Sequence, residues 1–348
     1  MLIFVVPVFF LKKTKGEIEV KKILNAPEQV VEEMMLGMAE AHKDIVHRVG
    51  ETRVLARNYE GAGKVGLISG GGSGHEPTHA GFVGQGMLSA AVFGDVFTSP
   101  TPDQVYEAVK AADKGAGVFM VIKNYTGDVL NFEMAKDMAE AEGIEVDFCI
   151  TKDDIAVEDS LYSDGQRGVA GTIFVHKILG YYAEQGASLK ELKELSEKLL
   201  PQMKTIGLAL SPAIVPEQGK PGFELADDEI EFGIGIHGEP GYQRVKLQPS
   251  KAMAEEIYAK LRKALALKAG DDVVVLVNGM GGTPLMEQYV FVNDVLGLLK
   301  ADKVNAVKTM VGDYMTSIEM AGLSLTLMKV TDKAWLDALN APVKTIAW

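Results

Sequence analysis

Short apolar segments alternate with amphipathic helical segments along most of this 348-residue chain. An apolar run of roughly four to eight residues bounded by Gly or Pro is typical of a buried strand. Strands that alternate with helices usually pair in parallel, because each helix carries the chain back across one face of the sheet. The alternation therefore predicts an α/β fold with a mostly parallel, doubly wound sheet. In such folds ligands bind at the carboxyl ends of the strands.

The same pattern gives the expected elements. We expect strands at 64–69, 88–93, 117–122, 144–150, 205–210, 272–277, 306–311 and 323–330. We expect helices at 25–47, 78–86, 99–112, 128–142, 172–184, 188–200, 250–267 and 285–300. The polar stretch 151–171 lacks clear periodicity and is expected to be an ordered functional loop or a lid.

The chain length indicates two domains rather than one core. We expect a first α/β domain at 20–202, to which the C-terminal residues 342–348 return. A second α/β domain is expected at 203–341 and carries His237. Mostly parallel or mixed sheets are expected in both, with the substrate site at strand ends.

The N-terminal residues 1–19 stand apart from this pattern. Residues 1–11 are nearly all apolar and are followed by a lysine-rich stretch. The apolar run is too short to span a membrane, and it lacks the basic start and small-residue cleavage site of a signal peptide. We expect an extension outside the fold; an extra edge strand is the competing interpretation.

Charge and cysteine content exclude several classes of partner. The formal net charge is −13, so the surface is expected to repel nucleic acid and anionic membranes. The single cysteine, Cys149, lies in an apolar run and cannot form an intrachain disulfide. We interpret it as a core thiol, and a reducing, cytoplasmic compartment is expected.

A glycine cluster with a histidine follows the strand at 64–69, in Gly70-Gly71-Gly72-Ser73-Gly74-His75-Glu76-Pro77. Glycines let the backbone approach a ligand closely. The phosphate-binding loop, the dinucleotide fingerprint and the nucleophile elbow all fail here, because their required lysine or glycines are absent. The pattern favours a small-ligand loop that presents His75, with a histidine that only hydrogen-bonds the loop as the alternative.

Two more segments carry candidate chemistry. Lys123 and Asp128 follow the strand at 117–122, on the same expected rim, and could orient a polyol; a helix N-cap is the alternative for Asp128. His237 lies in the glycine-rich segment 233–241, where an imidazole can serve as nucleophile, base or ligand.

The remaining histidines are expected to be structural. No cluster with metal-ligand spacing accompanies His237, so no metal site is expected. His42 and His47 fall on the first expected helix and His176 on another, while His79 is expected to cap or pack. The glycine-rich segment 278–284 is interpreted as a backbone turn.

These motifs together resemble the dihydroxyacetone-binding subunit of dihydroxyacetone kinase, of the type that depends on the phosphoenolpyruvate phosphotransferase system. The resemblance covers residues from about 20 to the end. The motifs that carry it, in order, are Gly-Gly-Gly-Ser-Gly-His-Glu-Pro (70–77), Lys-Asn-Tyr-Thr-Gly-Asp (123–128), Asp-Gly-Gln-Arg-Gly (164–168) and Gly-Ile-His-Gly-Glu-Pro-Gly (235–241).

The resemblance implies a chemistry. A ring nitrogen of His237 would add to the C2 carbonyl of dihydroxyacetone and form a covalent hemiaminal. Glycerol has no carbonyl and would be rejected, while glyceraldehyde remains a second candidate substrate. His75 and Asp128 would act on the substrate hydroxyls, and the resemblance leaves open which one is the base for phosphoryl transfer. The residues that would hold the substrate are Gly72, Ser73, Gly74, His75, Lys123, Asp128 and His237.

The resemblance also implies partners. No cofactor is expected on this chain; ADP or ATP with Mg²⁺ would be carried by a separate nucleotide-binding subunit, recharged through a phosphoryl-carrier protein. A homodimer is implied. Two rivals stay open: a non-catalytic paralogue that activates a transcription regulator, and a nicotinamide-dependent oxidoreductase, against which the missing dinucleotide fingerprint argues.

Overall fold

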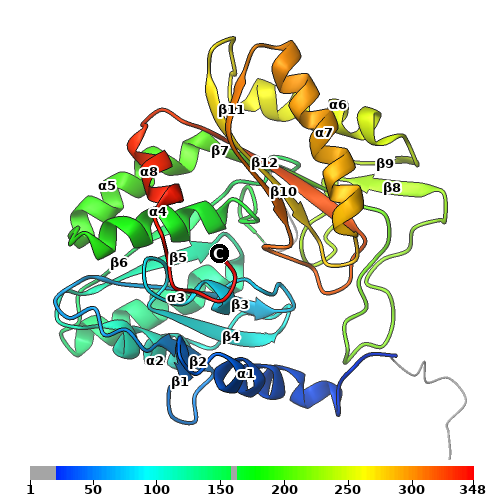
Figure 1. The fold of residues 1–348 in the computed structure, drawn as a ribbon. Coiled ribbons are helices and arrows are strands. Elements are labelled where there is room, and N and C mark those ends of the chain that lie inside the picture. The colour runs from blue at the N-terminus through cyan, green and yellow to red at the C-terminus, as the bar shows by residue number, and fades with distance from the viewer. Residues whose placement is uncertain (1–20, 158–162) are drawn as a thin grey trace, which may run out of the picture.

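The computed structural model describes residues 21–157 and 163–348, and these form two six-stranded sheets (Figure 1). The first sheet has the order β1-β2-β4-β3-β5-β6. Its strands are β1 (Val46–Arg48), β2 (Val54–Arg57), β3 (Gly66–Ser73), β4 (Ala90–Val96), β5 (Val118–Lys123) and β6 (Val146–Thr151). The four strands β4, β3, β5 and β6 run parallel, because α2 (Pro102–Ala112) and α3 (Thr126–Ala141) return the chain between successive strands.

The second sheet is mixed and has the order β11-β10-β12-β7-β8-β9. Its strands are β7 (Met203–Ala209), β8 (Glu229–Phe232), β9 (Gln243–Lys246), β10 (Asp272–Gly279), β11 (Asn305–Gly312) and β12 (Gly322–Lys329). Only β10 and β11 pair in parallel, across the crossover helix α7 (Leu285–Ala301). Loops rather than helices join β7 to β8 and β8 to β9, so these strands run antiparallel. The predicted class, α/β with mostly parallel or mixed sheets, is confirmed; a purely doubly wound arrangement is not found in the second sheet.

Helices form three layers around the two sheets (Figure 1). Helices α2 and α3 cover the outer face of the first sheet, and α6 (Ser250–Ala264) and α7 cover the outer face of the second. Between the sheets lie α4 (Thr172–Glu184), α5 (Leu189–Leu199) and α8 (Ala334–Asn340), in one core that includes Phe119 of β5 and Leu276 of β10. Helix α4 is buried on nearly every side, as its continuous apolar sequence requires.

The first expected helix, 25–47, is wrong only in its last residues, 42–47. It consists of a 3₁₀ turn, Pro27–Gln29, and α1 (Val30–Ala41), and then the chain becomes strand β1. His42 ends α1, whereas His47 lies on β1 rather than on a helix. Pairing with β2 decides this, and such pairing has no signal in a short local window.

Other boundaries also differ from expectation. The expected helix 78–86 is only a 3₁₀ turn, Ala80–Phe82, because Gly84 and Gly86 adopt positive φ and end it. Strand β9 and helix α8 were not expected. The C-terminal residues lie against the first sheet's half of the molecule, where the Ile346 N–H donates to the Gly81 carbonyl. The proposed division into domains remains a prediction, and the extension 1–19 falls outside the described residues.

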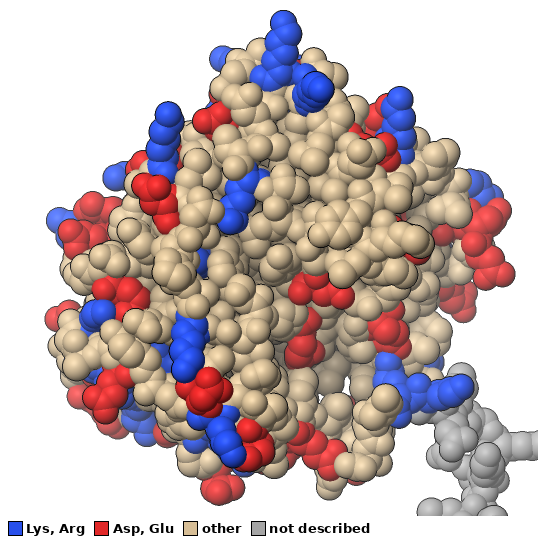
Figure 2. All heavy atoms as spheres, viewed as in Figure 1, with Lys and Arg blue, Asp and Glu red and all other residues tan. Residues whose placement is uncertain are grey.

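The surface carries both signs of charge. On the face shown in Figure 2, acidic and basic side chains are interspersed, and no large block of one sign is visible. Within the described ranges, no helix combines the length and apolar character needed to cross a membrane.

Candidate active site

The site is built at the carboxyl ends of β3 and β5. Strand β3 continues through the glycines to Ser73, and β5 ends at Lys123, immediately before α3 begins at Thr126. Neighbouring parallel strands end on the same edge of a sheet, so the two predicted motifs meet there. The structure therefore brings together the segments that carry His75 and Asp128.

The glycines of this loop allow close packing within the protein. A Cβ on Gly72 would lie 2.6 Å from the backbone nitrogen of Thr98, which follows β4. The Ser73 hydroxyl donates to the Gly94 carbonyl at 2.8 Å, and the Gly74 N–H donates to the Glu76 carboxylate at 3.1 Å. The side chain of Ser73 is thus already engaged, and substrate contacts from Gly72, Ser73 and Gly74 stay predictions.

His75 is fully buried and is held by the second half of the chain. Its Nδ1 lies 2.8 Å from the carbonyl oxygen of Thr316, in the loop between β11 and β12. A carbonyl can only accept, so Nδ1 carries the proton and Nε2 is an unprotonated acceptor. Burial, followed by the charges of His237 and Lys123, holds the pKa of His75 well below its ordinary value. A neutral imidazole with a free nitrogen at a strand edge can act as a base.

His237 is held by a carboxylate in the loop between β8 and β9. Its Nδ1 lies 2.9 Å from Glu239 Oε1, and its backbone N–H donates to Glu239 Oε2 at 2.8 Å. Burial opposes ionisation of Glu239, but His237 and Arg167 together lower its pKa to about 2. The ionised Glu239 accepts a hydrogen bond from Nδ1–H, which leaves Nε2 of His237 free as a nucleophile.

The two predicted histidines lie ring to ring. The centroid of His237 is 4.9 Å from that of His75, with the planes at 71°. Tyr125 and Phe97 also meet the His237 ring edge-on, with centroids at 4.7 Å and 5.2 Å. Phe97 has a φ of +57°, which is rare for a bulky residue, and its ring stacks on His75. His237, from the second half of the chain, therefore lies in a ring enclosure built by residues of the first half.

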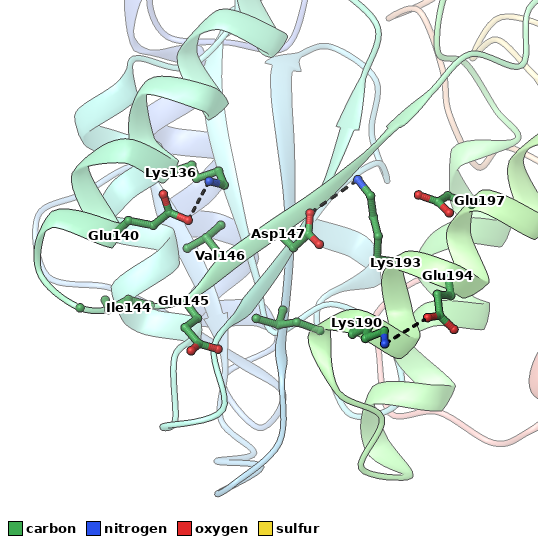
Figure 3. A pocket seen from close by; sticks show the side chains of 12 residues that line it. Lys136, Glu140, Ile144, Glu145, Val146, Asp147, Lys190, Lys193, Glu194 and Glu197 are labelled. Carbon is green, nitrogen blue, oxygen red and sulfur yellow. Dashed lines mark hydrogen bonds and ion pairs between the residues drawn. The ribbon is translucent and has the colours of Figure 1, made fainter.

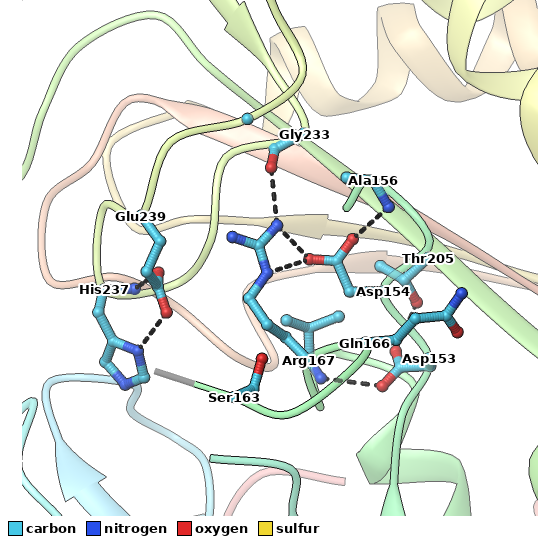
Figure 4. A network of polar contacts seen from close by, with 12 residues as sticks. Asp153, Asp154, Ala156, Ser163, Gln166, Arg167, Thr205, Gly233, His237 and Glu239 are labelled. Atoms are coloured by element: carbon cyan, nitrogen blue, oxygen red, sulfur yellow. Dashed lines mark hydrogen bonds and ion pairs between the residues drawn. The ribbon is translucent and has the colours of Figure 1, made fainter. Parts of the chain in front are cut away.

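A buried ion pair anchors this enclosure (Figure 4). Arg167 pairs with Asp154 through Nη2 at 2.6 Å and donates to the Gly233 carbonyl at 2.8 Å. Burial raises the pKa of Asp154 to about 6, against the opposing charge of Arg167. The described part of the predicted functional segment 151–171 thus ties β6 to the loop that carries His237.

Lys123 and Asp128 form a second buried pair. Lys123 Nζ lies 3.1 Å from Asp128 Oδ2, and both side chains are almost wholly buried. Oδ1 of Asp128 accepts from Ser99. Asp128 does not cap α3, because Tyr125 occupies the N-cap position without a side-chain bond and Asp128 lies within the first turn. The helix-cap alternative is therefore wrong.

Sequence reasoning missed the groups that orient the two histidines. The carboxylate two residues after His237 is a local signal, and it indicates Glu239. Thr316, Phe97 and Tyr125 come from separate segments, and nothing near His75 or His237 in the sequence indicates them. Across 21–157 and 163–348, no group of three or more His, Cys, Asp or Glu side chains is arranged to hold a metal ion.

A hollow lies on the opposite rim of the first sheet, at the edge where its parallel strands begin (Figure 3). It has a volume of about 650 Å³ and is lined by residues from the end of α3, the start of β6 and α5. Its lysines already contact carboxylates: Lys136 lies 2.7 Å from Glu140, and Lys193 lies 3.5 Å from Asp147. The start of a parallel strand is the far edge from the candidate site, so this hollow lies away from His75 and His237.

Comparison with known proteins gives the family of the chain. The family model described as the Dak1 domain matches residues 36–347. The dihydroxyacetone-binding subunit of a PTS-dependent dihydroxyacetone kinase from Listeria innocua is 65% identical over 328 residues, covering 94% of this chain and 100% of that protein.

Solved structures are similar as well. A dihydroxyacetone kinase operon co-activator is 43% identical with a TM-score of 0.86, covering 91% of this chain and 98% of that one. The dihydroxyacetone kinase of C. freundii is 33% identical with a TM-score of 0.86, and the match covers 95% of this chain but 60% of that one. The chain belongs to the Dak1 domain family.

Proposed function

We propose that this protein is the dihydroxyacetone-binding subunit of a kinase that draws its phosphoryl group from phosphoenolpyruvate, and that it holds dihydroxyacetone covalently on His237. The observation that carries this proposal is the hydrogen bond from His237 Nδ1 to the ionised Glu239, because it leaves Nε2 as the reactive nitrogen. Two relatives, 65% and 58% identical to this chain, are dihydroxyacetone-binding subunits of PTS-dependent dihydroxyacetone kinases.

The covalent step is an addition to a ketone. Nε2 of His237 forms a bond to C2 of dihydroxyacetone, and the carbonyl π bond breaks. The C2 oxygen gains one proton and the imidazole ring loses one, so the completed adduct is neutral. While the ring is cationic, the Glu239 carboxylate stabilises it, as a buried carboxylate does for a catalytic imidazolium. Glycerol is rejected because it has no carbonyl, and not through a difference in shape.

His75 and Asp128 supply proton transfer in this proposal. The free Nε2 of His75 is beside the His237 ring and serves hemiaminal formation. Asp128, held by Lys123 and Ser99, takes the proton of the terminal hydroxyl as that oxygen attacks phosphorus. General base assistance of this kind contributes about 10²–10⁴-fold to a rate. Substituting each residue separately decides between this assignment and the reverse.

The phosphoryl donor comes from a partner. A separate subunit that carries ADP or ATP with Mg²⁺ docks over His237 and is recharged through a phosphoryl-carrier protein, so the product is dihydroxyacetone phosphate. Positioning and charge neutralisation dominate such transfers, and the partner supplies much of both. We further propose that the subunit acts as a homodimer in the cytoplasm.

Binding of [2-¹³C]dihydroxyacetone to the full chain tests the adduct. In a ¹³C NMR titration, the ketone signal of bound substrate is expected to be replaced by a signal of a tetrahedral carbon. His237→Ala is expected to abolish that signal, whereas His42→Ala, at the end of α1, leaves it unchanged. A bound ketone signal at saturation, or a crystal soak with unlinked ligand at high occupancy, contradicts the covalent proposal.

The second candidate is a co-activator that binds dihydroxyacetone without phosphorylating it. The solved co-activator with the same fold favours considering it. Reconstitution with a nucleotide-binding subunit and the phosphoenolpyruvate-dependent components separates the two. The kinase proposal expects dihydroxyacetone phosphate from the wild-type chain and none from His237→Ala; the co-activator expects the adduct in the wild type without product.

A further inference from the structure

The segment 164–168 carries a buried arginine that the proposed chemistry does not use. Arg167 is fully buried. Its Nε and Nη2 lie 2.8 Å and 2.6 Å from Asp154 Oδ2, and Nη2 also donates to the Gly233 carbonyl at 2.8 Å. Nη1 has no hydrogen-bond partner within the described part of the chain. A buried ion pair that only anchors two segments can often be replaced by apolar side chains without loss of stability, so anchoring alone does not explain this charge.

The Nη1 end of Arg167 lies beside Glu239 (Figure 4). A Cβ built on Gly235 would overlap Glu239 Oε2 and would lie 2.6 Å from Arg167 Nη1. The two atoms therefore face the same small space, which exists because residue 235 has no side chain. They are neighbours without a hydrogen bond, so the interaction between the two side chains is one of charge.

Glu239 needs nearby positive charge in order to ionise. Its side chain is almost wholly buried, and burial penalises a carboxylate. Burial raises the pKa of Glu239, but His237 and then Arg167 more than offset this effect. An arginine is always protonated in a protein, whereas His237 must be neutral to act as a nucleophile. Before substrate binds, Arg167 is therefore the cation that favours the charged form of Glu239.

Asp154 limits the effect of this arginine on His237. A cation beside Glu239 also repels the imidazolium that forms as His237 attacks the ketone. Asp154 binds Nε and Nη2 of Arg167 on the side away from Glu239 and offsets that charge (Figure 4). The two carboxylates and the arginine together keep one net negative charge, which becomes neutralised when the His237 ring turns cationic.

We infer that Arg167 is a positioning residue, which keeps Glu239 as a carboxylate turned toward His237 before substrate binds. This inference rests on the proposed function for its effect on adduct formation. Without the arginine, burial favours a protonated Glu239, and a neutral acid no longer stabilises the cationic ring. The motif at 164–168 thereby gains a role in the reaction.

The charge of Glu239 can be measured without substrate. In the full chain labelled with ¹³C at the glutamate carboxyls, Glu239 is assigned by comparison with Glu239→Gln and is titrated to the lowest pH at which the chain stays folded. Arg167→Gln combined with Asp154→Asn gives a neutral pair that leaves no uncompensated carboxylate, and Arg167→Lys keeps the positive charge. The pKa of Glu239 is expected to be higher in the neutral pair than in the wild type, with Arg167→Lys between them. An unchanged pKa of Glu239 in the neutral pair overturns the inference.

Asp154→Asn alone is the control for the double substitution. It leaves Arg167 charged, so Glu239 is expected to stay as ionised as in the wild type. The other charged or titratable groups that face Glu239 are His237 in its own loop, His75 and Tyr125, and all three stay unchanged in these variants. If Asp154→Asn raises the pKa of Glu239 as much as the neutral pair does, the effect belongs to Asp154 and the inference is wrong.

The rate of adduct formation tests the consequence for the reaction. The neutral pair is expected to slow adduct formation by on the order of 10²-fold, the scale of a broken buried charge pair, and Arg167→Lys by less. In the Glu239→Gln background the neutral pair is expected to change the rate by less than about 2-fold, because the charge through which Arg167 acts is already absent. A purely structural role would slow both backgrounds equally, so equal losses contradict the inference.

Gly235→Ala tests the same contact through shape. The added methyl group occupies the space that Glu239 Oε2 and Arg167 Nη1 share, so adduct formation is expected to slow by about 10²-fold, as for a misplaced group. Gly222→Ala is the matched control, because the atom nearest to a Cβ there is the Ala213 carbonyl oxygen at 3.8 Å, and its rate is expected to equal that of the wild type. A wild-type rate in a folded Gly235→Ala contradicts the inference; if this variant does not fold, the neutral pair decides.

Failure of the inference and failure of the proposed function can be told apart. A wild-type chain that forms no adduct refutes the proposed function. The titration of Glu239 uses no substrate, so it still decides whether Arg167 keeps this carboxylate ionised.

Discussion

His75 and His237 lie ring to ring, yet different acceptors hold them. His75 is tied through Nδ1 to a backbone carbonyl and is wholly buried, so it stays neutral. His237 is tied to the ionised Glu239, and its side chain keeps 15% of its exposure. A neutral acceptor favours a ring that remains uncharged, while a carboxylate stabilises the ring as it gains charge. The comparison indicates a base on the first half of the chain and a nucleophile on the second.

The largest expected effect comes from removing the two rings separately. His237→Ala is expected to abolish the adduct entirely, because it removes the nucleophile, and His75 serves as the base in this proposal. His75→Ala is expected to slow adduct formation by about 10²–10⁴-fold while leaving the final occupancy similar, since a base changes the rate and not the equilibrium. NMR spectra recorded over time after labelled substrate is added measure the rate of adduct formation and the final occupancy. Equal loss of occupancy in the two variants would contradict the separate roles of the two histidines.

Neutralising Glu239 tests its carboxylate next. Glu239→Gln keeps an oxygen near Nδ1 but removes the charge, so a cationic ring is no longer stabilised. We expect adduct formation to slow by up to about 10⁴-fold, the loss seen when a carboxylate behind a catalytic histidine is replaced by an amide. Binding kinetics of labelled dihydroxyacetone give the result, and an unchanged rate would show that the charge of Glu239 plays no part. Thermal unfolding of the variant checks that the buried Arg167 has not disrupted the fold.

The buried histidines and Glu239 also predict a pH dependence of the free energy of unfolding, each in its own pH range. Burial first of all lowers the pKa values of His75, His79 and His176 in the folded chain, to about 3 for His176. The unfolded chain takes up these protons near pH 6.5, so the stability from the neutral rings is full above about pH 6.5 and declines as pH falls below it. Each ring contributes up to about 1.4 kcal/mol per pH unit.

Glu239 loses its contribution in the same direction, but at lower pH. Its folded pKa is lowered, so its contribution is present above its unfolded pKa of about 4.3 and is lost only as pH falls toward 2. Urea unfolding at pH 7, 6 and 5 is therefore expected to show a falling free energy of unfolding that originates in the histidines. A free energy that is constant over this range contradicts the neutral burial of these rings.

The smallest effect is expected on the opposite rim. Lys190 lines the hollow of Figure 3, is largely exposed, and lies 3.9 Å from Glu194. Lys190→Ala is expected to change the free energy of unfolding by less than about 0.5 kcal/mol and to leave adduct formation unaltered. A large loss of adduct in this variant would place a functional site at the hollow and undo the contrast between the two rims.

Local sequence signals explain which parts of the fold could be predicted. The expected helix at 172–184 matches α4, because its continuous apolar character is visible within a single window. The hairpin of β1 and β2 and the short strand β9 could not be predicted, because their residues become strands only through pairing with other strands. The mixed order of the second sheet likewise depends on loops that carry no topological signal.

Sequence by itself determined which residue types stand at the strand ends: glycines before His75, Lys123 at the end of β5 with Asp128 after it, and His237 among glycines. The conformational freedom of glycine and the periodicity of apolar residues are local properties, so they can be predicted from the sequence. Tertiary structure alone decided which ring nitrogen is free. That depends on the Thr316 carbonyl, 241 positions from His75. A hydrogen-bond partner that arrives through packing leaves no trace near the residue it orients, and it is this partner that assigns each histidine its tautomer.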